Sequence, residues 1–554
     1  MTRPNGYPIV LSAPLTEIVD NPGFFIQMGL ASLPGWMEWA ITRTYPRWRE
    51  VPVEPGGTAG VAPCGLRTLE NVLGKTFGTD NVAVCYPDGL GAFIGPDTRV
   101  VAISTHNPLG TTFAAGVYAS IFGSSKDPIN AVYARRMFEN VKASPHRESF
   151  RVIVGGSGAW QIQETSSLDD LGVDCVVEGR SESPEVLDVF RKALAGEPIP
   201  REIRGTHPID PDAIAVPVKR TTFGVIEMTT GCGRRCAFCA PDNSPRIDVP
   251  KEKIMAAVKA NVEAGNDQIS LATEDMFIWG SGRACFVPNR EALIDIHSSI
   301  AGYPGVRHVL LSHGTMAPVV VDPALIRELS DILLDKSPLE LPQVSTHPRG
   351  RVLSPLIGIE TGSPRLAKKL MPGKALPFDI SEWPSVVIEG LTILNRNNWI
   401  PVMTLIVGSP EETGEDIEAT LDLLYEMERR SLKALLVPSI FTPLRDTRMR
   451  NRRGITRTRG ISQLQWQLIM KSWQMSARIG LQTGWVRTAW PLGSYLFWAL
   501  QGRRANGPNF TWPLFLFAGF PEALLRKLGG LYRGVPLQLK HRDELFATGN
   551  HTMR

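Results

Sequence analysis

The sequence contains little cysteine, little excess charge and no long apolar run. Cysteine accounts for 7 of the 554 residues, and such a small, odd number argues against a disulfide framework. Lysine and arginine number 59 against 55 acidic residues, so the net charge of +4 gives no global bias toward nucleic acid. No uncharged apolar run reaches the roughly 18 residues of a membrane span, and the amino terminus lacks the basic-then-apolar pattern of a signal peptide. We therefore expect a cytoplasmic protein without a nucleic-acid partner.

The chain is long and apolar enough to form several domains. Its 554 residues exceed one ordinary domain, and a hydrophobic fraction of 43% is sufficient for sizeable cores. In the first 200 residues, short β-branched runs alternate with helical patterns, which predicts a doubly wound, Rossmann-like α/β sheet of parallel strands. The expected strands are residues 8–12, 81–85, 99–104, 151–155 and 174–178, with helices at 112–122 and 184–195. Residues 196–218 are polar and contain proline, so we expect a linker there.

A second alternation of strands and helices follows this linker. Its expected strands are residues 224–228, 268–271, 308–311, 356–359, 402–407 and 434–437. Six such repeats suit a partial (β/α)6 barrel, whose active site would lie at the carboxyl ends of the strands.

Three of the cysteines lie close together, immediately after the expected strand 224–228. Cys232, Cys236 and Cys239 have C-x3-C-x2-C spacing. Thiolates bind zinc or iron–sulfur clusters, and three thiolates leave one iron of a [4Fe–4S] cluster open to an outside ligand. The alternative is a zinc site completed by a distant cysteine or histidine, but zinc sites usually pair C-x2-C units and no second unit occurs. The three cysteines are therefore our candidate metal ligands and catalytic residues.

This loop resembles the signature of radical S-adenosylmethionine (SAM) enzymes, including Phe238 before the last cysteine. In that family the open iron chelates SAM, and an electron from the cluster cleaves SAM to methionine and a 5′-deoxyadenosyl radical. The resemblance covers about residues 220–445. It implies a [4Fe–4S] cluster and SAM as cofactors.

Further residues match this family in the expected order. Glu274 follows the strand 268–271, at the place of a motif that contacts the SAM amino group. The segment with Glu360 and Ser363 resembles the fourth-strand segment that meets the ribose, where a carboxylate can accept both hydroxyl hydrogens. Gly408, within 407–413, lies in a segment that resembles the adenine support. An ordinary strand-to-helix turn with an acidic first turn explains 407–413 almost as well.

Glycine-containing segments follow two strands of the first region, at 155–160 and 172–179. Glycine after a parallel strand lets a ligand approach the backbone. Because they precede the cysteine loop, these segments resemble the cobalamin-binding domain of a large radical SAM subgroup, which implies cobalamin as a third cofactor. The candidate cobalamin-binding residues are Ser104, His106, Gly155, Gly156, Ser157, Glu178 and Gly179.

His106 stands at the carboxyl end of the expected strand 99–104. The Asp-x-His-x-x-Gly motif of corrinoid proteins that coordinate cobalt through a histidine is absent, as it is from many radical SAM relatives. His106 therefore either faces the corrin or is a loop histidine bonded to backbone or solvent.

After residue 445 the sequence becomes rich in arginine and tryptophan. A helix lying in a membrane interface, a helical cap around an apolar substrate and an ordinary helical domain all suit this composition. We expect three parts: a cobalamin-binding-like α/β domain at 1–205, a radical SAM partial barrel at 206–445 and a mostly helical cap at 446–554. The tryptophans of this last part are Trp466, Trp473, Trp485, Trp490, Trp498 and Trp512, and a polar tail follows at 541–554.

The resemblance implies a reaction at an unactivated carbon, most often methylation, in which a second SAM methylates cobalamin. We expect an apolar or lipid-like small-molecule substrate, an external electron donor such as flavodoxin or ferredoxin, and peripheral contact with a membrane. Cyclisation or ring rearrangement without methyl transfer is one alternative, and a non-catalytic iron–sulfur or corrinoid redox module is another. A methylthiotransferase, with a second cluster on Cys64, Cys85 and Cys175, is a weaker alternative, because Cys85 and Cys175 lie in apolar runs typical of inert thiols.

Overall fold

The computed structural model describes most of the chain. The described residues are 3–20, 32–44, 50–111, 127–165, 167–207, 209–240, 244–283, 285–445, 447–455, 458–480 and 508–518. The expected helix 112–122, the tail 541–554, Trp485, Trp490 and Trp498 lie outside them, as does the side chain of Trp512.

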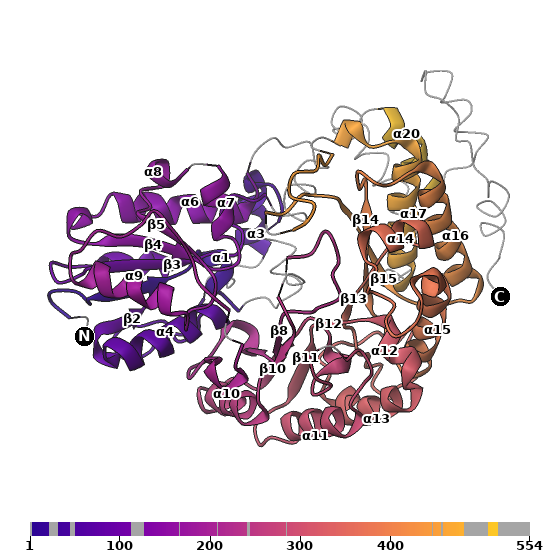
Figure 1. Ribbon diagram of the computed structural model, residues 1–554, viewed down its shortest axis with the longest axis horizontal. Helices are drawn as coiled ribbons and strands as arrows, with labels where there is room; N and C mark the ends of the chain where they lie inside the picture. Colours follow the sequence, from indigo (N-terminus) through magenta and orange to yellow (C-terminus); the bar gives the residue numbers. More distant parts are fainter. Residues whose placement is uncertain are drawn as a thin grey trace.

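The first part of the chain forms a six-stranded parallel sheet in the order β2-β1-β3-β4-β5-β6 (Figure 1). Alternate strand residues enter two separate hydrophobic clusters, one on each face, which is why these strands are continuous apolar runs. Helices α4 (Cys64–Phe77) and α9 (Pro184–Leu194) cover one face, and α6 (Ile129–Lys142) and α7 (Ala159–Glu164) cover the other. The predicted doubly wound sheet is confirmed. Its strands are β1 (Ile9–Ser12), β2 (Val82–Val84), β3 (Val100–Ser104), β4 (Arg151–Gly155), β5 (Cys175–Glu178) and β6 (Glu202–Arg204).

The prediction of a linker at 196–218 is wrong for three residues. Glu202–Arg204 forms β6, which pairs in parallel with β5 at the edge of the sheet. Only Ile203 packs against the core, whereas Glu202 and Arg204 are exposed. An edge strand with two charged residues out of three carries no apolar run, so the sequence pattern did not reveal it.

The second part of the chain contains the six expected parallel strands, in two sheets. One sheet has the order β11-β10-β7 and the other β12-β13-β14-β15, and Ser312 alone separates β11 from β12. Continuity of a barrel across that residue stays a prediction. The six expected strands are β7 (Val225–Glu227), β10 (Gln268–Ala272), β11 (His308–Leu311), β13 (Leu356–Glu360), β14 (Val402–Val407) and β15 (Leu435–Ile440), and the two-residue strand β12 (His313–Gly314) is an additional one. Helices α10 (Lys251–Glu263), α11 (Arg290–Ala301), α13 (Pro323–Leu333), α15 (Trp383–Arg396) and α16 (Gly414–Arg429) alternate with them.

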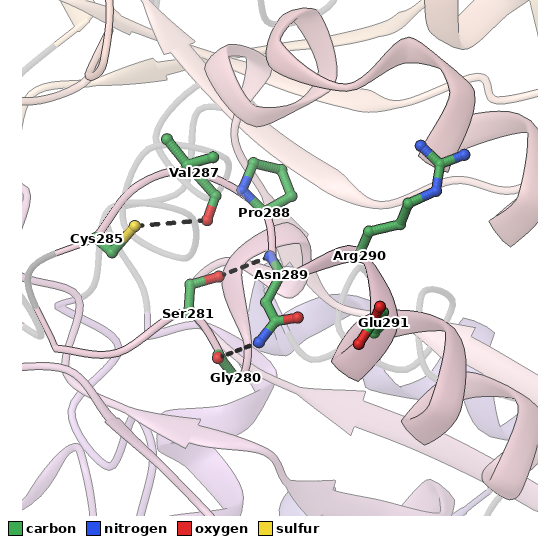
Figure 2. A pocket seen from close by; sticks show the side chains of 8 residues that line it. All are labelled: Gly280, Ser281, Cys285, Val287, Pro288, Asn289, Arg290 and Glu291. Atoms are coloured by element: carbon green, nitrogen blue, oxygen red, sulfur yellow. Dashed lines mark hydrogen bonds between the residues drawn. The ribbon is translucent and has the colours of Figure 1, made fainter.

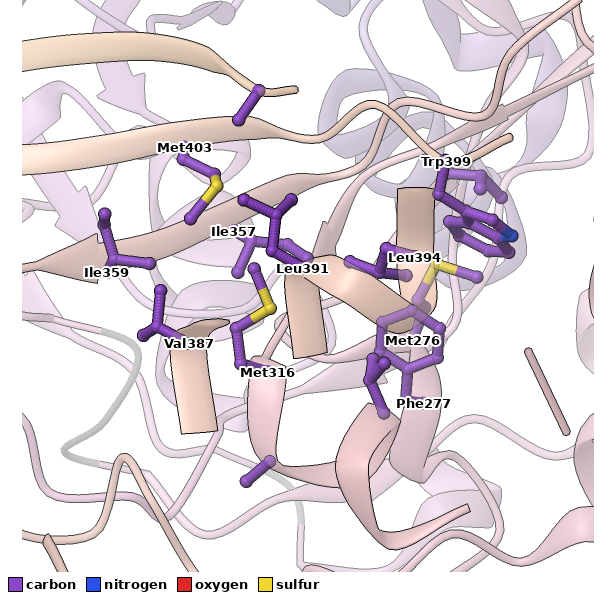
Figure 3. Packing of buried hydrophobic residues seen from close by; sticks show 14 of the residues in the cluster. Met276, Phe277, Met316, Ile357, Ile359, Val387, Leu391, Leu394, Trp399 and Met403 are labelled. Atoms are coloured by element: carbon purple, nitrogen blue, oxygen red, sulfur yellow. The ribbon is translucent and has the colours of Figure 1, made fainter. Parts of the chain in front are cut away.

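The largest core lies between these strands and their helices. Figure 3 shows Ile357 and Ile359 of β13 and Met403 of β14 beside Val387 and Leu391 of α15. Trp399, which is fully buried in the same cluster, satisfies its indole by donating from Nε1 to Ser330 Oγ at 2.7 Å. Burial of this set stabilises the second part of the chain independently of any ligand.

The other face of the same strands keeps access to solvent. In β14 and β15 the burial alternates strictly, so that Val402, Thr404 and Ile406 remain half-buried, as do Leu435 and Val437. Strands β7 and β10 alternate in the same way. Because successive side chains point to opposite faces, every half-buried residue lies on the face opposite the helical core. We call this the inner face.

The last described elements are helical. Helix α17 (Gln463–Gly480) packs on α16, and its Lys471 forms an ion pair with Glu428 at 2.5 Å. Trp466 of α17 is fully buried and makes an edge contact with Phe510 of α20 (Pro508–Phe517), with ring centroids 4.7 Å apart. Among the described residues, no helix combines the length and apolarity needed to cross a bilayer.

Candidate active site

The three cysteines lie on a loop that follows β7 and the short strand β8 (Thr229–Thr230). Strand β8 pairs with β9 (Ile247–Asp248), which closes the base of the loop. Cys236 is buried, whereas Cys232 and Cys239 are half-buried. The next residues along the loop also pack, because the N–H of Ala237 donates to the carbonyl of Leu370 at 2.6 Å.

Arg234 anchors this loop from within. Its side chain is 1% exposed, and Nη2 donates to Asp275 Oδ2 and to Thr315 Oγ1, both at 3.0 Å. Nη1 donates to the carbonyls of Gly373 and Lys374, each at 3.1 Å. The sequence analysis did not identify Arg234, because its partners lie 41 to 140 residues away along the chain.

The donor set of the loop fits an iron–sulfur cluster. In the described part of the chain, no three His, Cys, Asp or Glu side chains converge tightly enough to hold a single metal ion. Three thiols from one short loop, with no histidine or acidic residue between Cys232 and Cys239, are the ligands that iron–sulfur clusters use, and each would bind a different iron. Cys232, Cys236 and Cys239 would hold such a cluster.

Glu360 ends β13 in a strained backbone conformation, with its carboxylate close to Lys374. Its φ is +58°, and the pairing of β13 with β14 shifts register between Gly358 and Glu360. A Cβ on Gly358 would collide with Glu360 Oε1, so a larger residue there would displace the carboxylate from this position. Thr404 Oγ1 donates to Oε1 at 3.1 Å. Burial raises the pKa of Glu360 to about 6, although Lys374 and Thr404 act in the opposite direction. A non-glycine residue held at positive φ is a feature of functional sites.

Two further polar residues near Glu360 were missed by the sequence analysis. The ammonium of Lys374 lies close to Glu360 and would be 3.2 Å from a Cβ on Gly358. His313 in β12 accepts or donates a hydrogen bond of 2.7 Å with Ser312 Oγ. Its side chain is exposed, and desolvation and the charge of Lys374 lower its pKa.

Glu274 lies at the expected place, after β10, and is half-buried. Its N–H donates to Thr229 Oγ1 at 3.4 Å, which sets it beside the start of the cysteine loop. The neighbouring acid, Asp275, is the fully buried one and serves Arg234. The role of Glu274 in binding the SAM amino group therefore stays a prediction. Its neighbour Asp275 has a structural role, because it pairs with Arg234.

Ser363 and Gly408 already have partners within the chain. Ser363 Oγ donates to Asp416 Oδ1 at 2.6 Å and accepts from the N–H of Leu366, so it caps α14 (Pro364–Leu370). The N–H of Gly408 donates to Glu412 Oε1 at 3.0 Å. Residues 407–413 lead into α16 through a capping box, which is the strand-to-helix turn that the sequence analysis left open as an alternative.

The candidate cobalamin residues of β3 and β4 come together at the carboxyl edge of the first sheet. Ser104 is the register partner of Gly155. His106 Nδ1 lies 2.8 Å from Ser157 Oγ, and the imidazole is exposed. Gly156 has a φ of +92° and approaches the backbone of Thr105, so a side chain there would clash. This cluster is the loop arrangement expected where a ligand lies on the backbone.

Glu17, which the sequence analysis missed, holds the loop of His106. It follows β1 in α1 (Leu15–Ile18), on the other side of the crevice where the strand order reverses. Its carboxylate accepts from the N–H of His106 at 2.9 Å and from the N–H of Asn107 at 3.1 Å. Burial raises the pKa of Glu17 despite these bonds. Ligands of doubly wound sheets bind at such reversal points.

Ion pairs link the carboxyl edge of the first sheet to the second part of the chain. Glu178, which ends β5, accepts from Arg445 Nη1 at 2.7 Å. Arg180, one residue after Gly179, forms a two-pronged bond with Glu227 of β7, at 3.0 and 2.8 Å. Because Glu227 ends β7 and Arg445 follows β15, the carboxyl edges of the two parallel systems face each other (Figure 1).

A separate surface recess of about 440 Å³ precedes α11 (Figure 2). Asn289 shapes it: its Nδ2 donates to the carbonyl of Gly280 at 2.8 Å, and its Oδ1 accepts from the N–H of Ala292 to cap the helix. None of the predicted site residues lines this recess. Helix capping accounts for its shape.

No protein-family model matches the chain, and no curated protein matches its sequence. Solved structures do match. Radical SAM methyltransferase TsrM from Kitasatospora setae, with tryptophan substrate and the SAM analog aza-SAM bound, has a TM-score of 0.50 and 12% identity, covering 80% of this chain and 75% of that chain. TsrM with cobalamin and a [4Fe–4S] cluster bound has a TM-score of 0.49, 13% identity and coverages of 80% and 77%. The cobalamin-dependent SAM radical enzyme OxsB with aqua-cobalamin bound has a TM-score of 0.42 and 13% identity, with coverages of 76% and 52%.

At these identities the likeness is one of fold. The structural neighbours are cobalamin-dependent radical SAM enzymes that bind cobalamin, a [4Fe–4S] cluster and SAM or its analog. The expected resemblance to a radical SAM enzyme is confirmed at the level of the fold by the TsrM structure with a TM-score of 0.50.

Proposed function

We propose that the protein is a cobalamin-dependent radical SAM enzyme that methylates an unactivated carbon of an apolar or lipid-like small molecule. The observation that carries the proposal is the meeting of the two carboxyl edges. The cysteine loop stands at one edge and the His106–Ser157 cluster at the other, and Arg180–Glu227 and Glu178–Arg445 hold the edges together. Ligands of parallel α/β sheets bind at these edges, so two cofactors would face each other here.

The residues of the second part have separate tasks in this proposal. Cys232, Cys236 and Cys239 would hold the cluster, and Arg234 fixes their loop. Glu360 would accept the ribose hydroxyls of SAM, because its carboxylate is ionised above about pH 6 and its oxygens are free to accept more than the bond from Thr404. Bound at these edges, the cluster would supply the electron that cleaves SAM, and cobalamin would supply the methyl group.

The first part would hold cobalamin with its backbone. Gly155 and Gly156 bring the chain close to Ser104 and Thr105 without intervening side chains. His106 and Ser157 offer polar groups at the same place. Glu17 positions their loop from the opposite side of the crevice.

The inner face supports an apolar substrate. Its half-buried residues include Val225, Val402 and Val437, which leave apolar surface open on the side away from the helical core. Burial of substrate carbon against such residues contributes about 25 cal/mol per Å². Peripheral contact with a membrane would deliver a lipid-like substrate to this face.

An external electron donor such as flavodoxin or ferredoxin would reduce the cluster. The exposed side of the cysteine loop is basic, since Arg235 is exposed and Arg448 Nη2 donates to its carbonyl. A positive surface attracts acidic partners at low salt.

The test uses full-length protein purified without oxygen and reconstituted with iron, sulfide and hydroxocobalamin. Incubated with SAM and a strong reductant, it should bind corrin and form 5′-deoxyadenosine, and Cys236→Ala should form none. Cys285→Ala is the matched control, because Cys285 is exposed and lies outside the cysteine loop. Formation of S-adenosylhomocysteine, with a product heavier by one methyl group, supports methylation. A product formed with 5′-deoxyadenosine but without added mass of a methyl group supports cyclisation or rearrangement instead.

One outcome favours another function, and the structure speaks against the methylthiotransferase alternative. A cluster and a bound corrin with intact SAM would favour a redox module. A methylthiotransferase would need Cys64, Cys85 and Cys175 to share a second cluster, but Cys85 and Cys175 belong to hydrophobic clusters on opposite faces of the first sheet. Burial also raises the pKa of the Cys64 and Cys175 thiols to about 12, which disfavours the thiolate that binds iron.

A further inference from the structure

The backbone of Lys374 is fixed to the cysteine loop. Its carbonyl accepts from Arg234 Nη1 at 3.1 Å, as does the carbonyl of Gly373, and its own N–H donates to the carbonyl of Met371 at 2.9 Å. Arg234 stands between Cys232 and Cys236 in the sequence. The backbone of residues 373–374 therefore packs against the segment that joins the two thiols.

The ammonium of Lys374 lies among negative groups. It would be 3.2 Å from a Cβ on Gly358, the residue whose missing side chain also makes room for Glu360. Burial alone would lower the pKa of Lys374, but the charges of Cys236, Glu360 and Cys232 raise it above the ordinary value. The ammonium of Lys374 therefore lies beside the carboxylate of Glu360, and the backbone of the same residue is bonded to the cysteine loop.

Arg234, the other buried cation at this place, is already neutralised. Asp275 pairs with it at 3.0 Å, and Thr315 and backbone carbonyls occupy further donors. Its guanidinium also lies over the ring of Phe286, 4.6 Å from the centroid. His313 also faces Lys374, and desolvation and the charge of Lys374 lower the pKa of its imidazole. Lys374 and Glu360 therefore form a charged pair beside the loop that is separate from the Arg234 anchor.

We propose that Lys374 raises the reduction potential of the cluster held by Cys232, Cys236 and Cys239, and that Glu360 lowers it. The inference rests on the proposed function. Reduction adds one electron from an external reductant, so the iron–sulfur core passes from +2 to +1 and no bond or proton moves. A buried cation beside the thiolates stabilises that added negative charge, and a carboxylate destabilises it.

The experiment measures the midpoint potential of the cluster by anaerobic titration, followed by EPR of the reduced form, in reconstituted full-length protein without SAM. Glu360→Gln should raise the potential above that of the wild type, since the lysine is then unopposed. The double variant Lys374→Met with Glu360→Gln should have a lower potential than Glu360→Gln alone. Lys374→Arg should stay close to the wild type. Iron and sulfide content is measured for each protein, to confirm that equal clusters are compared.

The outcomes separate the two claims. If the wild type assembles a cluster and Glu360→Gln leaves its potential unchanged or lowers it, the electrostatic role of this pair is wrong while the proposed function stands. If the double variant assembles no cluster, the sign of the Glu360→Gln shift decides by itself. A wild type that binds no cluster overturns the proposed function and this inference together.

Discussion

The guanidinium of Arg234 and the carboxylate of Asp275 form an ion pair at 3.0 Å in which both side chains are 1% exposed. One residue belongs to the cysteine loop and the other follows β10, so the pair ties the loop to the end of a neighbouring strand. A buried pair of this kind costs desolvation free energy and is tolerated only when its donors and acceptors are satisfied.

Asp275→Asn is expected to destabilise the protein strongly, because Arg234 would be left as an unpaired buried charge. Breaking such a pair by removing one partner typically costs about 3–5 kcal/mol. Urea unfolding of the iron-free protein measures this cost. Arg235→Gln is the control, since Arg235 is exposed and should change the stability by less than about 0.5 kcal/mol. Equal stabilities of the two variants would contradict the anchoring role of Asp275.

The ion pair between Glu178 and Arg445 is expected to contribute little to thermal stability, and exchanging the two charges should restore part of what each single variant loses. Its side chains are 15% and 28% exposed, so solvent screening limits the coupling to about 1 kcal/mol. Glu178→Arg and Arg445→Glu should each lower the thermal midpoint, and the double variant should recover part of the loss. A double variant whose loss equals or exceeds the sum of the two singles would show that the residues are not coupled.

Glu17→Ala is expected to weaken corrin binding more than His106→Ala does. Removal of the carboxylate frees the N–H groups of His106 and Asn107 and loosens their loop, whereas His106→Ala keeps both bonds. We expect a loss of roughly tenfold in affinity for hydroxocobalamin, or about 1.4 kcal/mol. Absorbance titration of the full-length protein measures it. A larger loss for His106→Ala would mean that the imidazole itself holds the ligand.

Glu412 is expected to make stability depend on pH. Burial raises its pKa to about 7 from an ordinary 4.5, although Gln465 and Gly408 donate to it. The folded protein then holds a proton that the unfolded chain has lost, so stability falls as the pH rises from about 4.5 to 7. Thermal midpoints across this window should fall less steeply for Glu412→Gln, whose amide oxygen can still accept both bonds. A slope identical to that of the wild type would contradict this assignment.

The sequence predicts those parts of the fold that local patterns determine. The strands β1 to β5 and all six strands of the second part are apolar runs, because both faces or one complete face of each strand are buried. The sequence analysis did not predict strand β6, because its two charged residues lie at an exposed edge of the sheet. The cysteine spacing likewise identifies the loop, since all three thiols belong to eight consecutive residues of one segment.

The rest of the candidate site depends on contacts between distant segments. Lys374 follows a helix in a turn, and nothing in its immediate sequence distinguishes it from an exposed lysine; only the fold brings it to Glu360 and the cysteine loop. The register shift that turns Glu360 leaves no hydrophobic pattern in the sequence, so the sequence could not predict it. For Ser363 the sequence suggested a ligand-binding role from the resemblance, but the hydroxyl donates to Asp416 within the chain.

Along β14 and β15, buried residues alternate with half-buried ones, and the two sets tolerate substitution to different degrees. Met403, Leu405 and Val407 are locked in the helical core, where a change of one methylene group alters stability. Val402 on the same strand and Val437 on β15 are half-buried, so a change in their size or polarity has less effect on folding. Descendants of this chain could therefore acquire new substrates through one set of alternating positions while the other set preserves the scaffold.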